Sequence, residues 1–154
     1  LRPKVQGTWN LHRYFNSSRP VGFMIFCSSI AGVFGNPSQA GNTFQDRLAV
    51  WRRRQGLKAV SVSLGIMRDV GVIAEGASNF MATWDNVLGI REPVFHALMK
   101  SLIHGQQSCA RCDDAYPARI AVGLGSGDIL APNGLEKHPR FRPLAVTGNL
   151  SSAA

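Results

Sequence analysis

A short apolar run that ends on two serines constrains the fold of this chain more than any other feature. Residues 23–27, Phe-Met-Ile-Phe-Cys, are preceded by a glycine and followed directly by Ser28 and Ser29. A run of this length and character is typical of a strand buried in a parallel sheet, and we predict a strand over residues 22–28. Because catalytic and binding groups of open α/β sheets collect at the carboxyl ends of strands, the two serine hydroxyls are well placed for chemistry.

Regular apolar spacing predicts the elements around this strand. Phe44, Leu48 and Trp51 lie on one helical face and predict a helix over about residues 43–54, after a Gly-rich loop and before a C-cap at Gly56. The other predicted elements are a helix over 3–15 that buries Val5, Trp9, Leu11 and His12, a strand over 59–64, a weak helix or lid over 77–89, a helix after Pro93 and a strand over 120–124. Strands that alternate with helices indicate an α/β fold with a parallel sheet.

The composition narrows the class of protein. The chain has 154 residues, of which 45% are hydrophobic, and no apolar run approaches the ~20 residues needed to cross a bilayer. No secretory signal is visible at the start, and a cytoplasmic, reducing location is expected. Because the chain begins inside a predicted helix, we expect it to be a fragment.

The chain is basic, with 17 Lys and Arg against 9 Asp and Glu, a net charge of +8. The densest positive charge is the run Arg52–Arg54 after Trp51, and such a run on a helix is typically a solvated face. Two functional interpretations of the same run are a binding patch for nucleic acid and a docking surface for an acidic carrier protein. The charge alone does not decide between them, and a nucleic-acid partner is not expected for the chain as a whole.

The three cysteines do not form a disulfide framework or a zinc motif. Cys27 falls in the predicted buried strand, whereas Cys109 and Cys112 have CxxC spacing with His104 upstream and Asp113 adjacent. A structural zinc site would need a second pair at comparable spacing, and the sequence has none. We therefore predict an ordinary loop and no metal.

Several long motifs together resemble one known family. They are LRPKVQGTWNLH, SSIAGVFGNPSQA followed by GNTFQDRLAVWRRRQGL, SVSLGIMRDVG and RIAVGLGSGDILAPNGLEKHPRFRPLA. In this order they resemble the ketoreductase domain of a fungal, iterative, highly reducing polyketide synthase, a member of the short-chain dehydrogenase/reductase superfamily. The resemblance implies a partial Rossmann-like parallel sheet whose first strands, with their glycine fingerprint for pyrophosphate, lie upstream. It also implies that residues 1–135 are the C-terminal part of the domain and that residues 136–154 lead toward a carrier-protein domain.

The same resemblance implies an activity and a set of site residues. In this family a ketone is reduced by hydride from NADPH, here the β-keto group of an acyl chain held as a thioester on an acyl carrier protein. Carried over by motif, Lys4 resembles the family lysine, Ser29 the serine and Asn42 the asparagine. The loop at residues 65–67, which contains Gly65, Ile66 and Met67, resembles the segment that passes the nicotinamide ring and is the expected cofactor contact.

The family tyrosine has no counterpart in this chain. Family members carry a segment of the type SQANYAAGN, whereas this chain reads SQAGN, so that Asn42 falls where the tyrosine would stand. Reduction of a ketone builds alkoxide character on the carbonyl oxygen and needs a proton donor close by. An amide donates a hydrogen bond but does not deliver a proton. We therefore expect the parent domain to be an NADPH-dependent ketoreductase and the chain as written to be inactive.

Taken singly, the site residues also have plain structural interpretations. Ser28 and Ser29 can satisfy loop amides, Lys4 can be a solvated lysine, and Asn42 can cap a helix. A non-catalytic basic module that binds nucleic acid or a carrier protein through Trp51–Arg54 is the alternative function.

Overall fold

The computed structural model describes residues 2–34, 39–70, 89–108, 116–124, 137, 139 and 141–143. The chain divides into two compact units, one made of Leu1–Leu64 and Pro93–Val122 and the other of Gly65–Glu92 and Gly123–Ala154. Several predicted features lie outside the described residues: the lid at 77–88, the CxxC motif with Asp113, the glycine-rich stretch at 125–134 and most of the tail from residue 136.

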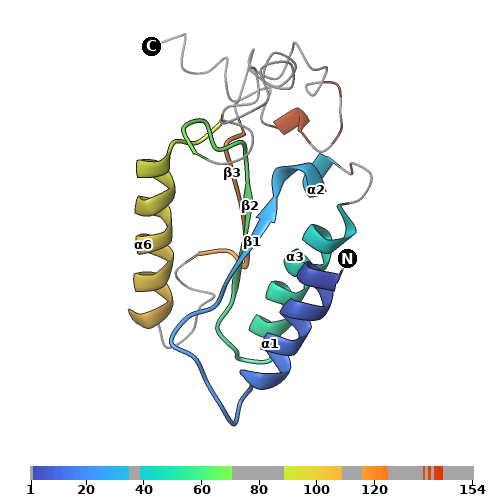
Figure 1. Cartoon of the computed structure of the whole chain (residues 1–154), viewed down its shortest axis with the longest axis vertical. Helices are drawn as coiled ribbons and strands as arrows, with labels where there is room; N and C mark the ends of the chain where they lie inside the picture. The colour runs from blue at the N-terminus through green and yellow to red at the C-terminus, as the bar shows by residue number, and fades with distance from the viewer. Residues whose placement is uncertain are drawn as a thin grey trace. The chain divides into compact units, whose positions relative to one another are not determined.

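The first unit is built on a three-stranded parallel sheet in the order β1-β2-β3 (Figure 1). The strands are β1 (Ile25–Ser29), β2 (Val60–Leu64) and β3 (Arg119–Val122). This confirms the predicted α/β fold with a parallel sheet. The first strand begins later than predicted because the backbone N–H of Met24 is bonded to the side chain of Gln106, at 3.0 Å, and not to a strand.

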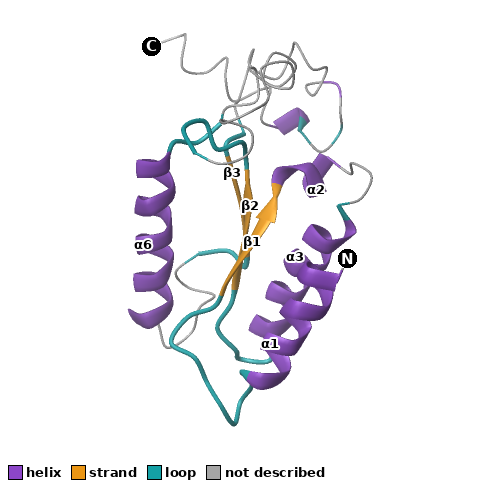
Figure 2. Ribbon diagram, viewed as in Figure 1, coloured by secondary structure: helices purple, strands orange, loops and turns teal. Residues whose placement is uncertain are grey.

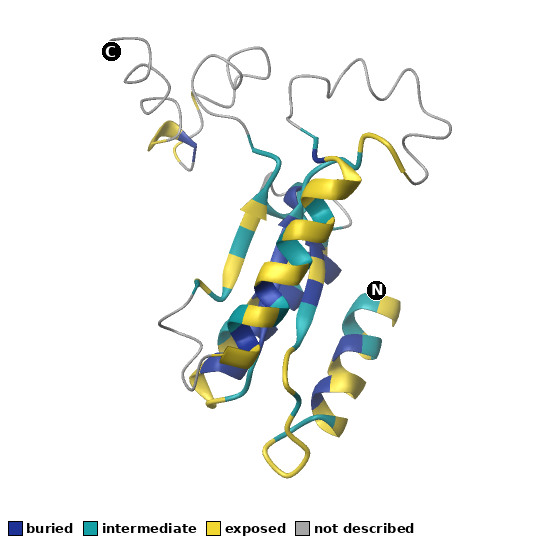
Figure 3. Cartoon of the chain, turned by 90° about the vertical axis from the view of Figure 1, so that its left-hand side faces the viewer, coloured by how far each residue is buried: buried dark blue, intermediate teal, exposed yellow. Residues whose placement is uncertain are grey.

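Helices cover both faces of this sheet (Figure 2). On one face, Leu48 and Ala49 of α3 (Ala40–Arg54) pack with Phe26 of β1. On the other face, Leu102 of α6 (Glu92–Ser108) packs with Val60 and Val62 of β2. Figure 3 shows α6 toward the viewer with its outward residues exposed, which is the pattern of an amphipathic helix on a sheet. Among the described helices, none combines the length and the hydropathy that crossing a bilayer requires.

The N-terminal helix begins as a π-helix. The π-helical segment η1 (Arg2–Gly7) runs directly into α1 (Thr8–Tyr14), so the predicted helix is present with an unexpected wide first turn. Such wide turns often occur at functional sites. Thr8 and His12 are the buried residues of α1, whereas Leu11 is 52% exposed, contrary to expectation. Thr8 and His12 are spaced i, i+4 and lie on one side of the helix. The buried side of α1 is therefore narrower than the apolar face that the sequence predicted.

A short helix, α2 (Ile30–Phe34), lies where a loop was predicted. The Ser29 hydroxyl oxygen accepts a hydrogen bond from the N–H of Ala31 at 3.3 Å, which caps this turn. Helix α3 begins at Ala40, earlier than predicted, because the N–H groups of Asn42 and Thr43 both bond to the Gln39 carbonyl. The helix is followed by Gly56 with φ of 72°, in the left-handed conformation expected of a glycine that ends a helix.

The second unit joins the segment after β2 to the start of α6. The backbone N–H of Ile90 donates to the carbonyl of Ile66 at 2.8 Å, and the N–H of Arg68 donates to the carbonyl of Ile90 at 3.1 Å. Both carboxylate oxygens of Asp69 accept from the N–H of Glu92, at 2.9 and 3.1 Å. Asp69 therefore satisfies a free N–H group at the start of α6.

Candidate functional site

Lys4 and Asn42, which lie far apart in the sequence, meet in the structure. The Lys4 ammonium donates to Oδ1 of Asn42 at 2.5 Å, to the backbone carbonyl of Cys27 at 3.0 Å and to Oε1 of Gln45 at 3.5 Å. A lysine ammonium has three protons and no acceptor, so three oxygen partners engage all of its donors. Lys4 is therefore held by the fold and is not the solvated lysine of the plain interpretation.

The carbonyl that Lys4 binds lies on the open edge of β1. The carbonyl of Met24 accepts from the N–H of Val60 in β2. Because backbone groups alternate between the two edges of a strand, the carbonyl of Cys27 points away from β2. Lys4 of η1 therefore occupies a backbone acceptor on the side of β1 that faces away from β2.

The Asn42 side chain is oriented by its neighbours so that its oxygen faces Lys4. Its Nδ2 donates to Oε1 of Gln39, and its backbone carbonyl accepts from the hydroxyl of Ser28 at 3.2 Å. Asn42 is buried and lies inside α3, whose N-cap position is Gln39. Asn42 is therefore not the helix N-cap, and it presents an acceptor, not a donor, to the ammonium.

Ser29 is not part of this hydrogen-bonded cluster. Within the described residues its hydroxyl accepts from Ala31, whereas it is the neighbouring Ser28 that reaches the backbone of Asn42. The structure thus brings two of the three predicted catalytic residues into contact and gives Ser29 a capping role. The hydrogen bond from the N–H of Ala31 to Ser29 agrees with the structural interpretation of the serines, in which they satisfy loop amides.

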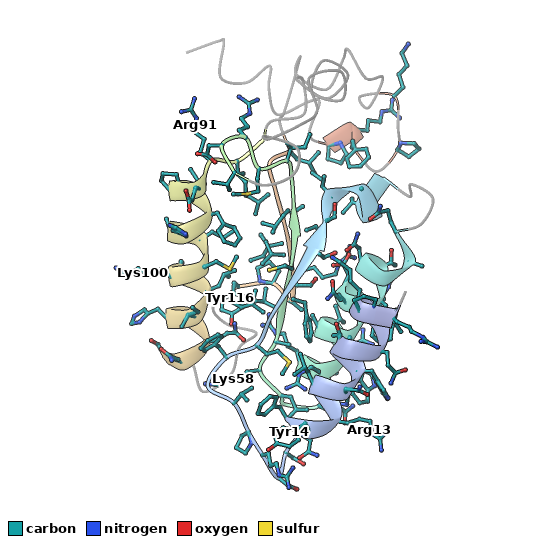
Figure 4. The ribbon with its side chains drawn as sticks, viewed as in Figure 1. Arg13, Tyr14, Lys58, Arg91, Lys100 and Tyr116 are labelled. Carbon is teal, nitrogen blue, oxygen red and sulfur yellow. The ribbon has the colours of Figure 1, made fainter. Side chains whose placement is uncertain are left out.

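Among the described residues, the partners of the Lys4 ammonium do not include either tyrosine of the chain. Figure 4 labels Tyr14 and Tyr116. Tyr14 ends α1, is 57% exposed and carries the Arg19 guanidinium 4.7 Å above its ring. Tyr116 packs beside α6, and the guanidinium of Arg53 lies 5.3 Å from its ring centre. Helix α3 begins at Ala40 and continues through Gly41 and Asn42. The side chain that contacts the Lys4 ammonium at this position is the amide of Asn42.

The comparisons with known proteins identify a family and its relatives. The KR domain family matches residues 1–69. A reducing polyketide synthase of Floropilus chiversii is 66% identical over 158 aligned residues, which cover 96% of this chain and 6% of that protein. One of Metacordyceps chlamydosporia is 62% identical over 165 residues, which cover 100% of this chain and 7% of that protein. A highly reducing polyketide synthase of Gibberella zeae is 58% identical over 164 residues, with the same coverage.

The chain belongs, over residues 1–69, to the ketoreductase (KR) family, and over nearly its whole length it is similar to one segment of fungal reducing polyketide synthases. It spans only about 6–7% of the length of these relatives. Each of the three alignments extends over more positions than this KR chain has residues. The relatives therefore carry residues in the matched region that the KR chain lacks.

The predicted cofactor contacts of the KR chain lie in the second unit. Gly65 directly follows β2, the carbonyl of Ile66 accepts from Ile90, and Met67 forms a parallel bridge with Ile90. The Ile66 carbonyl is thus already engaged in the fold. The assignment of these three residues to a cofactor stays a prediction.

The basic run of the KR chain is not the solvated face that was predicted. Arg52 is 1% exposed and donates to Nδ1 of His12 at 2.8 Å and to the carbonyl of Phe15 at 2.8 Å. Arg53 is 7% exposed and donates to the carbonyl of Tyr116 at 2.7 Å. Their burial leaves Arg54 as the exposed arginine of the run, so Trp51–Arg54 does not form the basic patch that the alternative function needs.

Gln45 and Asp46 were not among the residues predicted from the sequence. Asp46 is 2% exposed and accepts from the hydroxyl of Ser61 at 2.6 Å and from the Arg119 guanidinium at 3.2 Å. Gln45 contacts Lys4. Its spacing of i+3 from Asn42 places both side chains on one face of the helix, and that spacing is the signal that could have identified it.

Proposed function

We propose that the protein to which this KR chain belongs reduces the β-keto group of a carrier-bound polyketide intermediate with NADPH, and that this chain does not complete that step itself. The acyl carrier protein and the other domains of a cytoplasmic synthase are the proposed partners. The family membership supports the first part of the proposal. The arrangement of Lys4 and Asn42 supports the second.

A reductase site must provide a proton as well as a hydride. When bound, NADPH supplies the hydride, and the developing alkoxide needs a donor within hydrogen-bond reach. A phenol is made acidic enough for this task by a nearby cation that stabilises its ionised form. In this chain the cation is Lys4, and the group beside it is the amide oxygen of Asn42. Loss of a general acid typically lowers the rate by about 10²–10⁴.

The single observation that carries the proposal is the engagement of all three Lys4 protons by protein oxygens. A tyrosine inserted before Gly41 would have to take the place of one of these oxygens. The relatives carry residues within the matched segment that this chain lacks, since the alignments are longer than the chain.

A graft into a relative tests both parts of the proposal. The aligned segment of the Floropilus chiversii synthase is replaced by this chain, and NADPH oxidation is measured with a β-ketothioester. We expect the unmodified synthase to be active, the graft to be inactive, and insertion of Asn-Tyr-Ala-Ala after Ala40 to restore activity. Insertion of Asn-Phe-Ala-Ala is the matched control and should restore nothing. If the graft oxidises NADPH without the insertion, the proposal that this chain cannot complete the step is wrong. If the unmodified synthase does not oxidise NADPH, the proposed reductase activity is wrong.

A further inference from the structure

Gln45 lies between Lys4 and a residue one helical turn further along the chain, Thr8. Its Oε1 faces the Lys4 ammonium at 3.5 Å, and its Nε2 donates to the hydroxyl oxygen of Thr8 at 3.1 Å. Gln45 is 8% exposed and Thr8 is 5% exposed, so water does not compete freely for either side chain. The two ends of one amide therefore serve two different partners.

We propose that Thr8 and Gln45 are a positioning pair that holds the Lys4 ammonium between α3 and the open edge of β1. An amide has an accepting end and a donating end, and a flip exchanges them. The Lys4 ammonium, which has only donors, selects the oxygen end of the amide, and the Thr8 hydroxyl oxygen accepts from the NH₂ end and thereby holds the side chain in that position. If the amide flipped, its NH₂ group would face the ammonium, and two donors would repel each other. This inference extends the proposed function, on which it rests only for the choice of site, because the geometry does not depend on turnover.

The Thr8 side chain offers a clean way to separate hydrogen bonding from packing. Thr8→Val keeps the branched shape and removes the acceptor, whereas Thr8→Ser keeps the acceptor and removes a methyl group. If Thr8 only fills space, serine is the more disruptive change. If it orients Gln45, valine is the more disruptive change for Lys4.

The experiment measures the exchange of the lysine ammonium protons by ¹H–¹⁵N NMR in the full chain. Lys100 is exposed on α6 and serves as the internal reference. We expect the Lys4 protons to exchange more slowly than those of Lys100. Thr8→Val should accelerate Lys4 exchange about tenfold and leave Lys100 unchanged, while Thr8→Ser should keep the slow rate. An unchanged rate in Thr8→Val, or equal acceleration in Thr8→Ser, would overturn the inference.

A second variant guards against an indirect effect on folding. Gln45→Glu places a carboxylate beside the Lys4 ammonium, and its negative charge holds the ammonium without help from a partner at position 8. In the Gln45→Glu background, Thr8→Val should therefore have no effect on the Lys4 exchange rate. If Thr8→Val accelerates exchange equally in both backgrounds, Thr8 acts through general stability and the positioning pair is refuted.

Discussion

The guanidinium of Arg52 donates a hydrogen bond to Nδ1 of His12 across 2.8 Å, with both side chains buried. A guanidinium has only donors, so Nδ1 must accept and the ring proton must be on Nε2. His12 is thus neutral in the fold. Burial, and secondarily the charge of Arg52, lower the pKa of His12 below its usual value.

The first prediction is that the chain loses stability as the pH falls below about 6.5, the ordinary histidine pKa. Because the pKa of His12 is lowered in the fold, the unfolded chain binds more protons there, and the stabilisation present above the unfolded pKa is lost as the pH falls through the folded pKa. Thermal unfolding at pH 7.5 and pH 5 measures this. His12→Gln should lose less stability than the parent over that range, and His96→Gln, on the exposed side of α6, should behave as the parent. Equal acid sensitivity in His12→Gln would contradict the prediction.

The second prediction concerns the buried arginine itself. Arg52→Met removes the bonds to His12 and to the carbonyl of Phe15, and it leaves the buried Nδ1 of His12 without its donor. We expect a loss of about 2–3 kcal/mol in the free energy of unfolding, measured by urea denaturation. Arg54→Met, the matched change at the exposed end of the same basic run, should stay within about 0.5 kcal/mol. Similar losses for the two variants would argue against a buried role for Arg52.

The third prediction separates two aspartates by the same substitution. Asp46→Asn removes the charge that accepts from Ser61 and Arg119 in the interior and should cost about 1–3 kcal/mol. Asp69→Asn should cost little, because asparagine is an equally good partner for the free N–H at a helix start. Urea denaturation measures both variants. The reverse order of the two losses would refute the assigned roles.

The fourth prediction uses two glycines at the candidate site. A Cβ at Gly41 would lie 3.0 Å from the Cβ of Lys4, so Gly41→Ala must push η1 away from α3 and should cost about 1–3 kcal/mol. Gly7 has helical φ and ψ of −61° and −48°, and a Cβ there meets nothing within 4 Å. Gly7→Ala should therefore stabilise the chain by about 0.5–1 kcal/mol. Thermal unfolding gives the sign directly, and a stabilising Gly41→Ala would contradict the tight packing.

The strands were predictable because their signals are local. The run at residues 59–64 combines apolar residues with two small serines and follows a turn, and it becomes β2 within one residue of the predicted start. The start of β1 was less predictable, because the side chain that takes the N–H of Met24 belongs to Gln106. That partner comes from a distant helix that no local pattern identifies.

The polar interior was not predictable from local patterns. A run of three arginines has the pattern of a solvated face, and only the arrival of His12 and Phe15 gives Arg52 partners that compensate its burial. In the same way, Asp46 becomes a core residue through Arg119 on β3. The family motifs predicted Lys4 and Asn42 as members of one site. The capping role of Ser29 was not predicted, because the Gly-rich segment after it indicated a loop and not helix α2.

The hydrogen bonds from Lys4 to the Cys27 carbonyl of β1 and to Asn42 of α3 have a consequence for the interpretation of other sequences. Because Lys4 joins η1, β1 and α3, selection for folding alone would retain it together with Asn42, even in a lineage that no longer reduces ketones. A genome survey that recognises reductases by their lysine and asparagine would count such relics as working enzymes. A survey that also requires the tyrosine in the SQANYAAGN segment would separate them.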